Sequence, residues 1–256
     1  MRGEKSAQAF EVEYDYLIMA HGARANRFGI PGVEENAFFL REIHEARAIR
    51  RHLLQNIQLA RLPCTSDEEK KRLLSVVVVG GGPTGVEFAA DLADFLYQDI
   101  NKLAPALRDQ FMVTIVEANE VLGSFDMNLR NYAAARMKKC GVRIKKGIVQ
   151  EVKEREVILT DGDVLPNSLV IWSTGVGPAP LTNIIDCDKT KRGRICVDLN
   201  LRVQKDDKPI PGVYAAGDCA AYADKTKMEP LPTLAAVASR QGKYLSTYCR
   251  QSGLIR

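Results

Sequence analysis

The chain of 256 residues is long enough to bury the core of one large domain or of two small ones. Hydrophobic residues make up 46% of it and charged residues 27%, which is typical of a globular protein and excludes a disordered or collagen-like chain. The net charge is only +4, and acidic residues accompany the basic ones, so we do not expect binding to nucleic acid. We interpret the basic run KRGR at 191–194 as a solvated loop.

Membrane insertion, targeting and metal binding have no clear sequence signal. No apolar run reaches the about 18 residues of a membrane-spanning helix. The first ten residues, MRGEKSAQAF, have neither a secretory apolar core nor an Arg-rich, acid-free helix, so we expect no targeting segment there. The six cysteines are scattered without CxxC spacing, and the three histidines are not grouped with them. We therefore expect reduced, mostly buried thiols and no metal site.

The first predicted element is a short buried strand in YDYLIMAHGA (14–23), which ends in glycine. A Pro/Gly-rich loop follows it. A helix is predicted over 41–62 because apolar residues such as Ile49, Leu53 and Ile57 recur on one face. The polar segment at 63–72 is the candidate domain boundary.

The next stretch, SVVVVGGGPTGVEFAADLADFL (75–96), predicts a strand, a glycine turn and a helix. The valines favour a parallel strand that is buried on both faces. Gly80 would permit a tight turn, Gly82 a close approach of backbone to a pyrophosphate, and Gly85 close packing of the helix on the strand. Amides at the helix start would then face the phosphates. The alternative is a glycine turn without a ligand, but the three parts occur in the order that a dinucleotide site requires.

A second strand is predicted over 111–119, and Glu117 lies at its end. A carboxylate there can accept hydrogen bonds from both ribose hydroxyls of adenosine and would repel a 2′-phosphate, which favours NADH over NADPH. The gap from Gly85 exceeds the usual about 20 residues, which indicates a lengthened crossover through QDINKLAPALRDQ (98–110). The alternative is an ordinary surface glutamate.

The remaining elements are a helix over 128–142 that Gly141 would end, and short strands over 143–166 with a turn at Asp161–Gly162. A further buried strand is predicted in SLVIWSTGVGPAP (168–180). LIMAHGA and LVIWSTGV both end in small-x-Gly, as expected of two strands that each return past a nucleotide. A helix is predicted in PTLAAVASRQGKYLSTYCRQ, the segment 232–251.

Four runs, GGGPTGVEFAADLADFL, VEANEVLGSFD, VYAAGDCA and LPTLAAVASRQGKYL, together with YDYLIMAHGARANRFGIPGVEENAFFLREIHEARAIRRHL, resemble the type II NADH dehydrogenases. These are single-subunit, non-proton-pumping NADH:quinone oxidoreductases of mitochondria and bacteria. The resemblance covers nearly the whole chain and implies an α/β fold with two Rossmann-like domains, the NADH domain being inserted into an FAD domain that is incomplete here. The expected divisions are a partial FAD-binding domain with a linker helix (1–72), the NADH-binding domain (73–177) and the return into the FAD-binding domain (178–256).

The implied activity is transfer of hydride from NADH to FAD and of electrons to ubiquinone in the respiratory chain, with Glu87 near the reacting rings. The resemblance also implies a quinone partner, a peripheral place on the mitochondrial inner membrane through a segment absent here, and a possible homodimer. The residues that match the NADH site are Gly80, Gly82, Pro83, Thr84, Gly85, Glu87, Glu117, Thr174 and Gly175. Those that match the FAD site are Ala20, Gly22, Gly217, Asp218, Ala235 and Ala236.

The chain departs from the family pattern in two ways. It has no second GxGxxG near its start, and the membrane-docking C-terminal segment is missing. It also reads AAVASRQG where AQVASQQG is usual, so Ala236 removes an amide that could orient a quinone carbonyl and Arg240 adds a charge that needs a partner. These departures favour a second hypothesis, a binding or structural relative that binds NADH at most. A disulfide or ferredoxin reductase ranks third, because no reactive cysteine pair is visible.

Overall fold

The computed structural model describes residues 9–100, 102, 104–107, 110–222, 231–251 and 253. The chain forms two compact units: unit 2 is Ala25–Gly175, and unit 1 takes the residues up to Arg24 and those from Val176 onward. Unit 2 is thus inserted into the sequence of unit 1, as the resemblance implied. The boundary predicted at 63–72 is wrong, because the helices on both sides of it pack into the core of unit 2.

Two expectations fall partly on residues that the structure does not describe. The first eight residues, where we expected no targeting segment, lie outside the described residues. So do residues 101, 103, 108 and 109 of the predicted long crossover. The described part of that crossover continues α4 (Pro83–Phe95) as a π-helix at Leu96–Ile100, and a short 3-10 helix follows at Pro105–Leu107.

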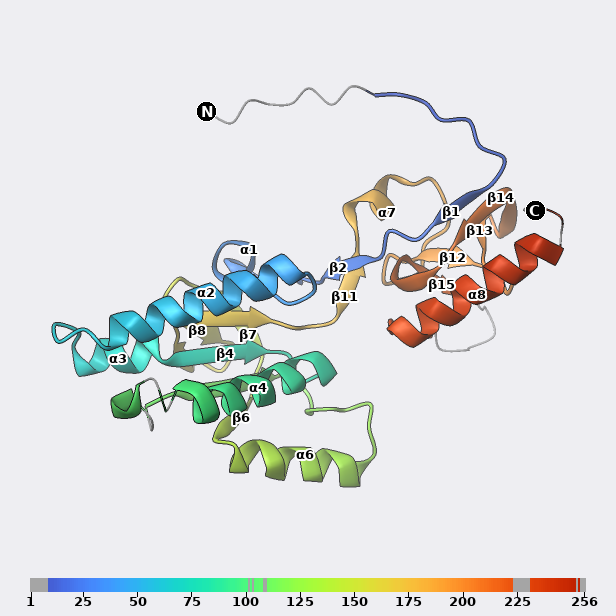
Figure 1. The fold of residues 1–256 in the computed structure, drawn as a ribbon. Coiled ribbons are helices and arrows are strands. Elements are labelled where there is room, and N and C mark those ends of the chain that lie inside the picture. Colours follow the sequence, from blue (N-terminus) through green and yellow to red (C-terminus); the bar gives the residue numbers. More distant parts are fainter. Residues whose placement is uncertain are drawn as a thin grey trace. The chain divides into compact units, whose positions relative to one another are not determined.

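Unit 2 is built on a five-stranded parallel sheet (Figure 1). Every neighbouring pair in it is parallel. Each residue of the central strand is buried, as the run of valines predicts for a parallel strand covered on both faces. The strand order is β3 (Phe38–Phe39), β10 (Leu169–Trp172), β4 (Ser75–Val79), β5 (Met112–Glu117) and β6 (Val142–Lys146).

The two faces of this sheet carry different layers. Val76 and Val78 share a core with four helices, whereas Val77 and Val79 pack in a second core with a small antiparallel sheet. The alternation follows from the two-residue period of a strand. The helices are α2 (Ile43–Ala60), α3 (Asp67–Leu73), α4 and α6 (Met127–Lys139), and the small sheet comprises β7 (Val149–Val152), β8 (Glu156–Leu159) and β9 (Val164–Pro166).

Turns and helix ends follow local sequence signals, with one exception. Gly141 follows α6 with a φ of 78°, and Gly162 lies between β8 and β9 with a φ of 89°, so both predicted turns are confirmed. The exception is the segment at 63–72, which holds α3 rather than a linker. The Ser66 hydroxyl caps this helix by accepting a hydrogen bond from the Glu69 backbone N–H at 3.2 Å. Unit 2 also contains the short helix α1 (Val33–Asn36).

Unit 1 contains a second five-stranded sheet and α8 (Ala235–Gln251) (Figure 1). Leu245 of α8 belongs to the core of this unit. The order is β1 (Leu17–Met19), β14 (Lys208–Ala215), β13 (Arg202–Lys205), β12 (Ile195–Val197) and β15 (Ala220–Tyr222). β1 is parallel to β14, and β12 to β15. The shorter elements are β2 (Ala23–Ala25) paired with β11 (Val176–Pro178), α7 (Pro180–Ile184) and the 3-10 helix η3 (Gly217–Cys219).

The structure has the short strand predicted within 14–23, but the prediction that it is buried is wrong. β1 has three residues, and the side chains of Leu17 and Ile18 are 36% and 49% exposed. The reason is its edge position: among the described strands only β14 pairs with it.

The cysteines are free thiols: Cys196, Cys219 and Cys249 are buried, Cys140 and Cys187 half-buried, and Cys64 exposed. Within the described part of the chain, no helix has the length and apolar character needed to cross a membrane.

Candidate dinucleotide site

The glycine loop lies where a dinucleotide site is expected in a parallel sheet, between the carboxyl end of β4 and the start of α4. Gly80 turns the chain with a φ of 109°, a conformation that side chains rarely permit. Its N–H donates to the Val116 carbonyl at 2.9 Å. A Cβ on Gly80 would lie 2.9 Å from the backbone carbonyl group of Ser173. The tight turn predicted for Gly80 is therefore confirmed.

Gly85 and Gly82 meet opposite surroundings. A Cβ on Gly85 would lie 2.0 Å from the Gly80 carbonyl oxygen and 2.6 Å from Ser173 Oγ, so the helix can pack this closely only with glycine there. A Cβ on Gly82, in contrast, would meet nothing within 4 Å. Gly82 is the N-cap of α4, and Pro83 opens the helix. The loop thus presents open backbone at the helix start, where the first N–H groups have no partners within a helix.

Glu117, at the end of β5, is anchored by backbone at both of its carboxylate oxygens. Oε2 accepts from the Gly81 N–H at 2.6 Å, and Oε1 accepts from the Asn119 N–H at 2.9 Å. The Gly81 carbonyl accepts from the Leu122 N–H at 2.8 Å. The glycine loop and the segment after β5 are therefore joined side by side. Each carboxylate oxygen has a second lone-pair site for a further donor.

The residues after β10 adjoin the glycine loop. The Ser173 N–H donates to the Val79 carbonyl at 2.8 Å, and its hydroxyl donates to the same oxygen at 2.9 Å. The predicted site residue Thr174 donates its hydroxyl to the Asn26 carbonyl at 3.1 Å, and the Gly175 carbonyl accepts from the Asn26 N–H at 3.4 Å. Sequence reasoning noted Ser173 only as the small residue in the small-x-Gly ending of LVIWSTGV and gave it no role at the site. It missed Asn26, which belongs to no motif.

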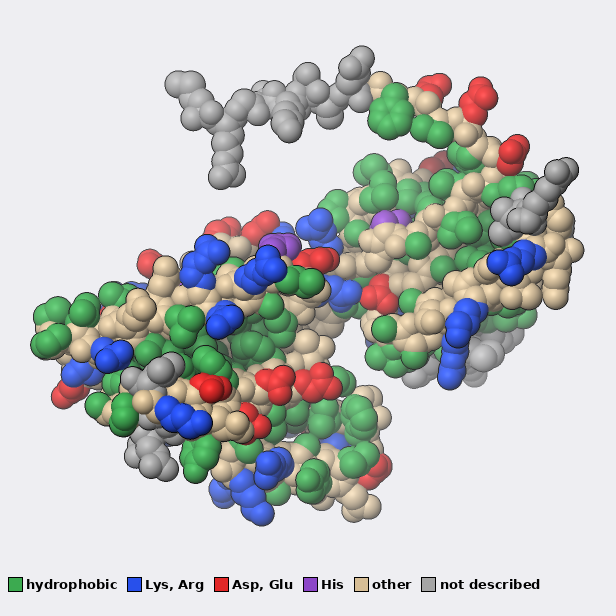
Figure 2. Space-filling model, viewed as in Figure 1, with side chains coloured by type: hydrophobic (Ala, Val, Ile, Leu, Met, Phe, Trp, Pro, Cys, Tyr) green, Lys and Arg blue, Asp and Glu red, His purple; other side chains and the backbone are tan. Residues whose placement is uncertain are grey.

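Thr84 and Glu87 lie on the exposed side of α4. Glu87 shares this helix face with Asp91 and Asp94, which are also exposed, and Figure 2 shows acidic side chains along α4. The structure therefore places Glu87 one turn from the glycine loop on a solvated acidic face. Its role near the reacting rings stays a prediction.

In unit 1 the predicted flavin residues gather at one edge of the sheet. Met19 is paired with Ala215 at the carboxyl ends of β1 and β14, so Ala20 and Gly22 come off the sheet beside Gly217 and Asp218. The Met19 carbonyl accepts from the Ala216 N–H at 3.0 Å and from the Cys219 thiol at 3.4 Å. Burial raises the pKa of the Cys219 thiol. This thiol is therefore a packed donor and not a reactive thiolate.

The helix α8 contacts η3 through a residue that sequence reasoning did not single out. The Gly217 N–H donates to Gln241 Oε1 at 2.7 Å. Ala235 and Ala236, in the first turn of α8, are exposed, and so is Arg240. The retained glutamine of AAVASRQG thus faces η3, while the two altered positions face solvent.

The interpretation of KRGR as a solvated loop is wrong for its last residue. Lys191 and Arg192 are exposed, but Arg194 is partly buried and donates to the carbonyls of Asp218 at 3.1 Å and Leu231 at 3.2 Å. Burial lowers the pKa of the Arg194 guanidinium, and the charge of Asp218 opposes that shift. A run of basic residues gives no signal of this burial, because the partners are backbone oxygens distant in sequence.

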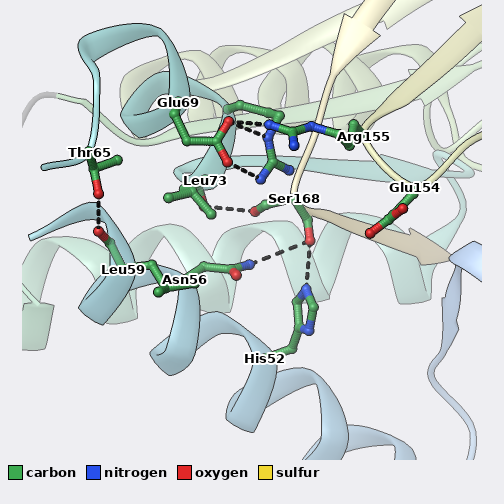
Figure 3. Close-up of a pocket in the computed structure, with 10 residues that line it drawn as sticks. His52, Asn56, Leu59, Thr65, Glu69, Leu73, Glu154, Arg155 and Ser168 are labelled. Atoms are coloured by element: carbon green, nitrogen blue, oxygen red, sulfur yellow. Dashed lines mark hydrogen bonds and ion pairs between the residues drawn. The ribbon is translucent and has the colours of Figure 1, made fainter. Parts of the chain in front are cut away.

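A separate pocket of about 290 Å³ opens at the amino end of the parallel sheet of unit 2, away from the glycine loop (Figure 3). Its polar groups bind one another: Glu69 pairs with Arg72 at 2.7 Å and also with Arg155. His52 Nε2 lies 2.8 Å from the Ser168 carbonyl oxygen. The ion pair with Arg155 joins α3 to the β7–β8 turn, and the contact of His52 joins α2 to the residue before β10. These pairings account for the charges of Glu69, Arg72 and Arg155 without a ligand.

Comparison with known proteins places the chain in a sequence family. The model of the family described as pyridine nucleotide-disulphide oxidoreductase matches residues 2–242. An internal alternative NAD(P)H-ubiquinone oxidoreductase A1, mitochondrial, of Solanum tuberosum is 49% identical over 244 residues, covering 95% of this chain and 48% of that protein. A probable NADH dehydrogenase of Dictyostelium discoideum is 40% identical over 240 residues, covering 93% of this chain and 51% of that protein.

A solved structure agrees with these similarities. NDH2 from Plasmodium falciparum in complex with NADH superposes with a TM-score of 0.77 at 31% identity, covering 82% of this chain and 45% of that one. The resemblance to NADH dehydrogenases and the Rossmann-type α/β fold are thereby confirmed. The chain spans about half the length of the curated relatives that it matches.

Proposed function

Since the chain belongs to the pyridine nucleotide-disulphide oxidoreductase family, we propose that it is an NADH:quinone oxidoreductase that uses FAD. The single observation that carries this proposal is the glycine loop, in which Gly80 packs against Ser173, the residue after β10, and Gly85 packs against Gly80 and Ser173, while Gly82 stays open. The names of the relatives support ubiquinone as the electron acceptor. The proposal concerns the whole protein. This chain spans about half the length of the relatives.

The residues of unit 2 fit the binding of NADH. The amide of Gly81 is already bonded to Glu117, so the diphosphate would be met by Gly82 and by the first turn of α4, Pro83 excepted because it has no N–H. Thr84 and Gly85 provide amides in that turn. Thr174 and Gly175 would flank the ligand at the end of β10.

Glu117 supports NADH over NADPH as the preferred donor. Its two oxygens are held in place by the N–H groups of Gly81 and Asn119, and each can still accept from one ribose hydroxyl of the adenosine. A 2′-phosphate would bring negative charge against this carboxylate. We propose that Glu87 lies toward the nicotinamide, as its place near the start of α4 allows.

The residues of unit 1 fit part of an FAD site. Ala20, Gly22, Gly217 and Asp218 share one sheet edge, and the Asp218 carboxylate can accept from ribityl hydroxyls, while Ala235 and Ala236 lie at the start of α8. FAD, when bound, would accept a hydride from NADH and pass two electrons on to a quinone. The chain's own part is to orient both nucleotides. No acid–base pair is required of it.

The place of action is also a proposal. Several relatives are named mitochondrial, which supports a mitochondrial location. We propose peripheral association with the inner membrane, where a quinone is available, and a homodimer as the assembly. Ala236 and Arg240 replace amides expected near the quinone, so we expect weaker orientation of that substrate.

The test is purification of the full-length protein, followed by an absorbance spectrum and an assay with NADH and a soluble quinone. We expect a yellow protein that oxidises NADH when the quinone is present. The fluorescence of Trp172, which is buried at the end of β10 and donates to the Asn26 carbonyl, reports NADH binding separately. For the 256-residue chain alone we expect NADH binding with weak or no retention of flavin.

The second candidate is a binding or structural relative without flavin. The observation that favours it is the pair of altered positions in α8, Ala236 and Arg240, which replace amides expected near the quinone. A full-length protein that binds NADH but retains no added FAD would support this candidate over the enzyme.

A further inference from the structure

We propose that Arg194 is a positioning residue for the flavin edge of unit 1, where it holds η3 and the approach to α8 in one fixed arrangement. The inference rests on the proposed function, because it concerns the same edge. It assigns a role to a residue that belongs to no nucleotide motif.

The contacts of Arg194 join two segments that carry predicted flavin residues. Nε donates to the Asp218 carbonyl at 3.1 Å, and Nη1 donates to the Leu231 carbonyl at 3.2 Å. Asp218 is the predicted acceptor for ribityl hydroxyls, and Leu231 lies four residues before Ala235, the first residue of α8. A planar guanidinium can make both bonds at once, since its donors point in fixed, diverging directions.

A second contact joins η3 directly to α8. The Gly217 N–H donates to Gln241 Oε1 at 2.7 Å, and a Cβ on Gly217 would lie 3.7 Å from the Ala238 side chain. Gly217 has a φ of 76°, so the turn depends on glycine. With Gln241 holding Gly217 and Arg194 holding Asp218, η3 cannot shift without breaking at least one of these bonds.

Arg194 also compensates charge at this edge. Its guanidinium and the Asp218 carboxylate attract each other, and this attraction opposes the lowering of the Arg194 pKa by burial. Lysine would keep this charge, but its single ammonium group lacks the rigid fork that spans two carbonyls. Substitution can therefore separate two effects of Arg194: its positive charge, and the pair of hydrogen bonds by which it joins Asp218 to Leu231 (the Arg194 brace).

The experiment compares Arg194→Lys and Arg194→Gln with Arg192→Gln, an exposed arginine of the same turn, in the full-length protein. The readouts are FAD affinity, the visible spectrum of the bound flavin, hydrogen exchange of peptides that contain 217–219 and 235–241, and NADH affinity. We expect both Arg194 variants to weaken FAD binding about tenfold, the loss expected for one charged hydrogen bond. Exchange at 217–219 should rise and the flavin spectrum should shift.

NADH affinity should stay unchanged in all three variants, because the NADH residues lie in unit 2, and Arg192→Gln should match the parent. If Arg194→Lys binds FAD as the parent does, charge alone suffices and the brace is wrong. If Arg194→Gln lowers the melting temperature but leaves FAD affinity and exchange unchanged, the role is only structural and the inference is overturned. If the parent itself retains no FAD, the proposed function fails, and this inference fails with it.

Discussion

Glu117 Oε2 accepts a hydrogen bond from the backbone N–H of Gly81 at 2.6 Å, which joins the end of β5 to the middle of the glycine loop. The Glu117 carboxylate therefore has two roles. It holds the glycine loop, and in the proposed function it accepts hydrogen bonds from the adenosine ribose. The other oxygen is held by Asn119. The loop and the ribose acceptor are thus organised before any nucleotide arrives.

Glu117→Gln should weaken NADH binding about tenfold, because the amide replaces one anionic acceptor with a donor. Its NH2 group would face one of two backbone N–H groups, so either Gly81 or Asn119 loses its acceptor. Removal of the negative charge should also lessen discrimination against the 2′-phosphate. Calorimetric titration with NADH and with NADPH measures both effects.

The matched control for this substitution is Glu151→Gln, on β7 and away from the glycine loop. It should leave both affinities unchanged. A Glu117→Gln variant that kept the parent's ratio of NADH to NADPH affinity would remove Glu117 from ribose recognition.

The sequence predicts the local parts of this site well and the long-range parts poorly. The tight turn at Gly80 and the close packing at Gly85 are properties of a strand–turn–helix segment, so the spacing of glycines suffices to predict them. The bond between Glu117 and Gly81 joins the end of β5 to the glycine loop after β4, and no spacing rule anticipates it.

Charge patterns are a weaker guide. The polar composition of 63–72 predicts a linker, yet Ser66 caps a helix there whose Leu73 enters the core. Arg194 is likewise partly buried because it donates to the carbonyls of Asp218 and Leu231, which are distant from it in sequence. Burial of a charged residue depends on tertiary partners, which a single sequence does not reveal.

Gly82→Ala and Gly85→Ala should separate binding from stability. Gly82 has φ −73° and ψ 178°, which alanine adopts easily, and its Cβ would meet no atom within 4 Å. We expect a stability change of no more than about 1 kcal/mol. NADH binding should nevertheless fall, because the new methyl group occupies the space where the diphosphate would approach.

Gly85→Ala should instead destabilise unit 2 by about 3 kcal/mol, since its Cβ would lie 2.0 Å from the Gly80 carbonyl oxygen. Chemical denaturation measures the unfolding free energy of both variants, and calorimetry measures NADH affinity. If Gly82→Ala binds NADH like the parent, the proposal that this open backbone meets the nucleotide is wrong.

Glu69, in the pocket at the amino end of the parallel sheet, should make a pH-dependent contribution to stability. The hydrogen bond and ion pair that Glu69 makes with Arg72 lower the pKa of its carboxyl group. Because the folded pKa lies below the unfolded one, the stabilisation is full above the unfolded pKa and is lost as pH falls through the folded pKa. Glu69→Gln should cost about 1 kcal/mol at neutral pH and nearly nothing in acid below the folded pKa.

Urea denaturation across this pH range checks the prediction, with the exposed neighbour Glu68→Gln as control. A Glu69→Gln cost that is the same at neutral and acid pH would mean that lost packing, not charge, is responsible.

Ser173→Ala tests whether the end of β10 supports the Gly80 turn. The Val79 carbonyl would still accept from the Ser173 N–H at 2.8 Å, so no acceptor is left without a partner there. The contact of the hydroxyl with the Gly80 carbonyl at 3.2 Å would be lost. We expect a cost of about 1 kcal/mol and a NADH affinity a few-fold weaker, as measured by denaturation and by Trp172 fluorescence.

Combining Ser173→Ala with Gly85→Ala identifies what the Gly85 methyl group would strike. The nearest atom is the Gly80 carbonyl oxygen at 2.0 Å, whereas Ser173 Oγ is at 2.6 Å and disappears in the double variant. Because backbone cannot move aside as a side chain can, we expect the penalty of Gly85→Ala to persist almost in full, with a coupling energy below about 0.5 kcal/mol. A double variant as stable as Ser173→Ala alone would show instead that the hydroxyl, and not the turn, excludes a side chain at residue 85.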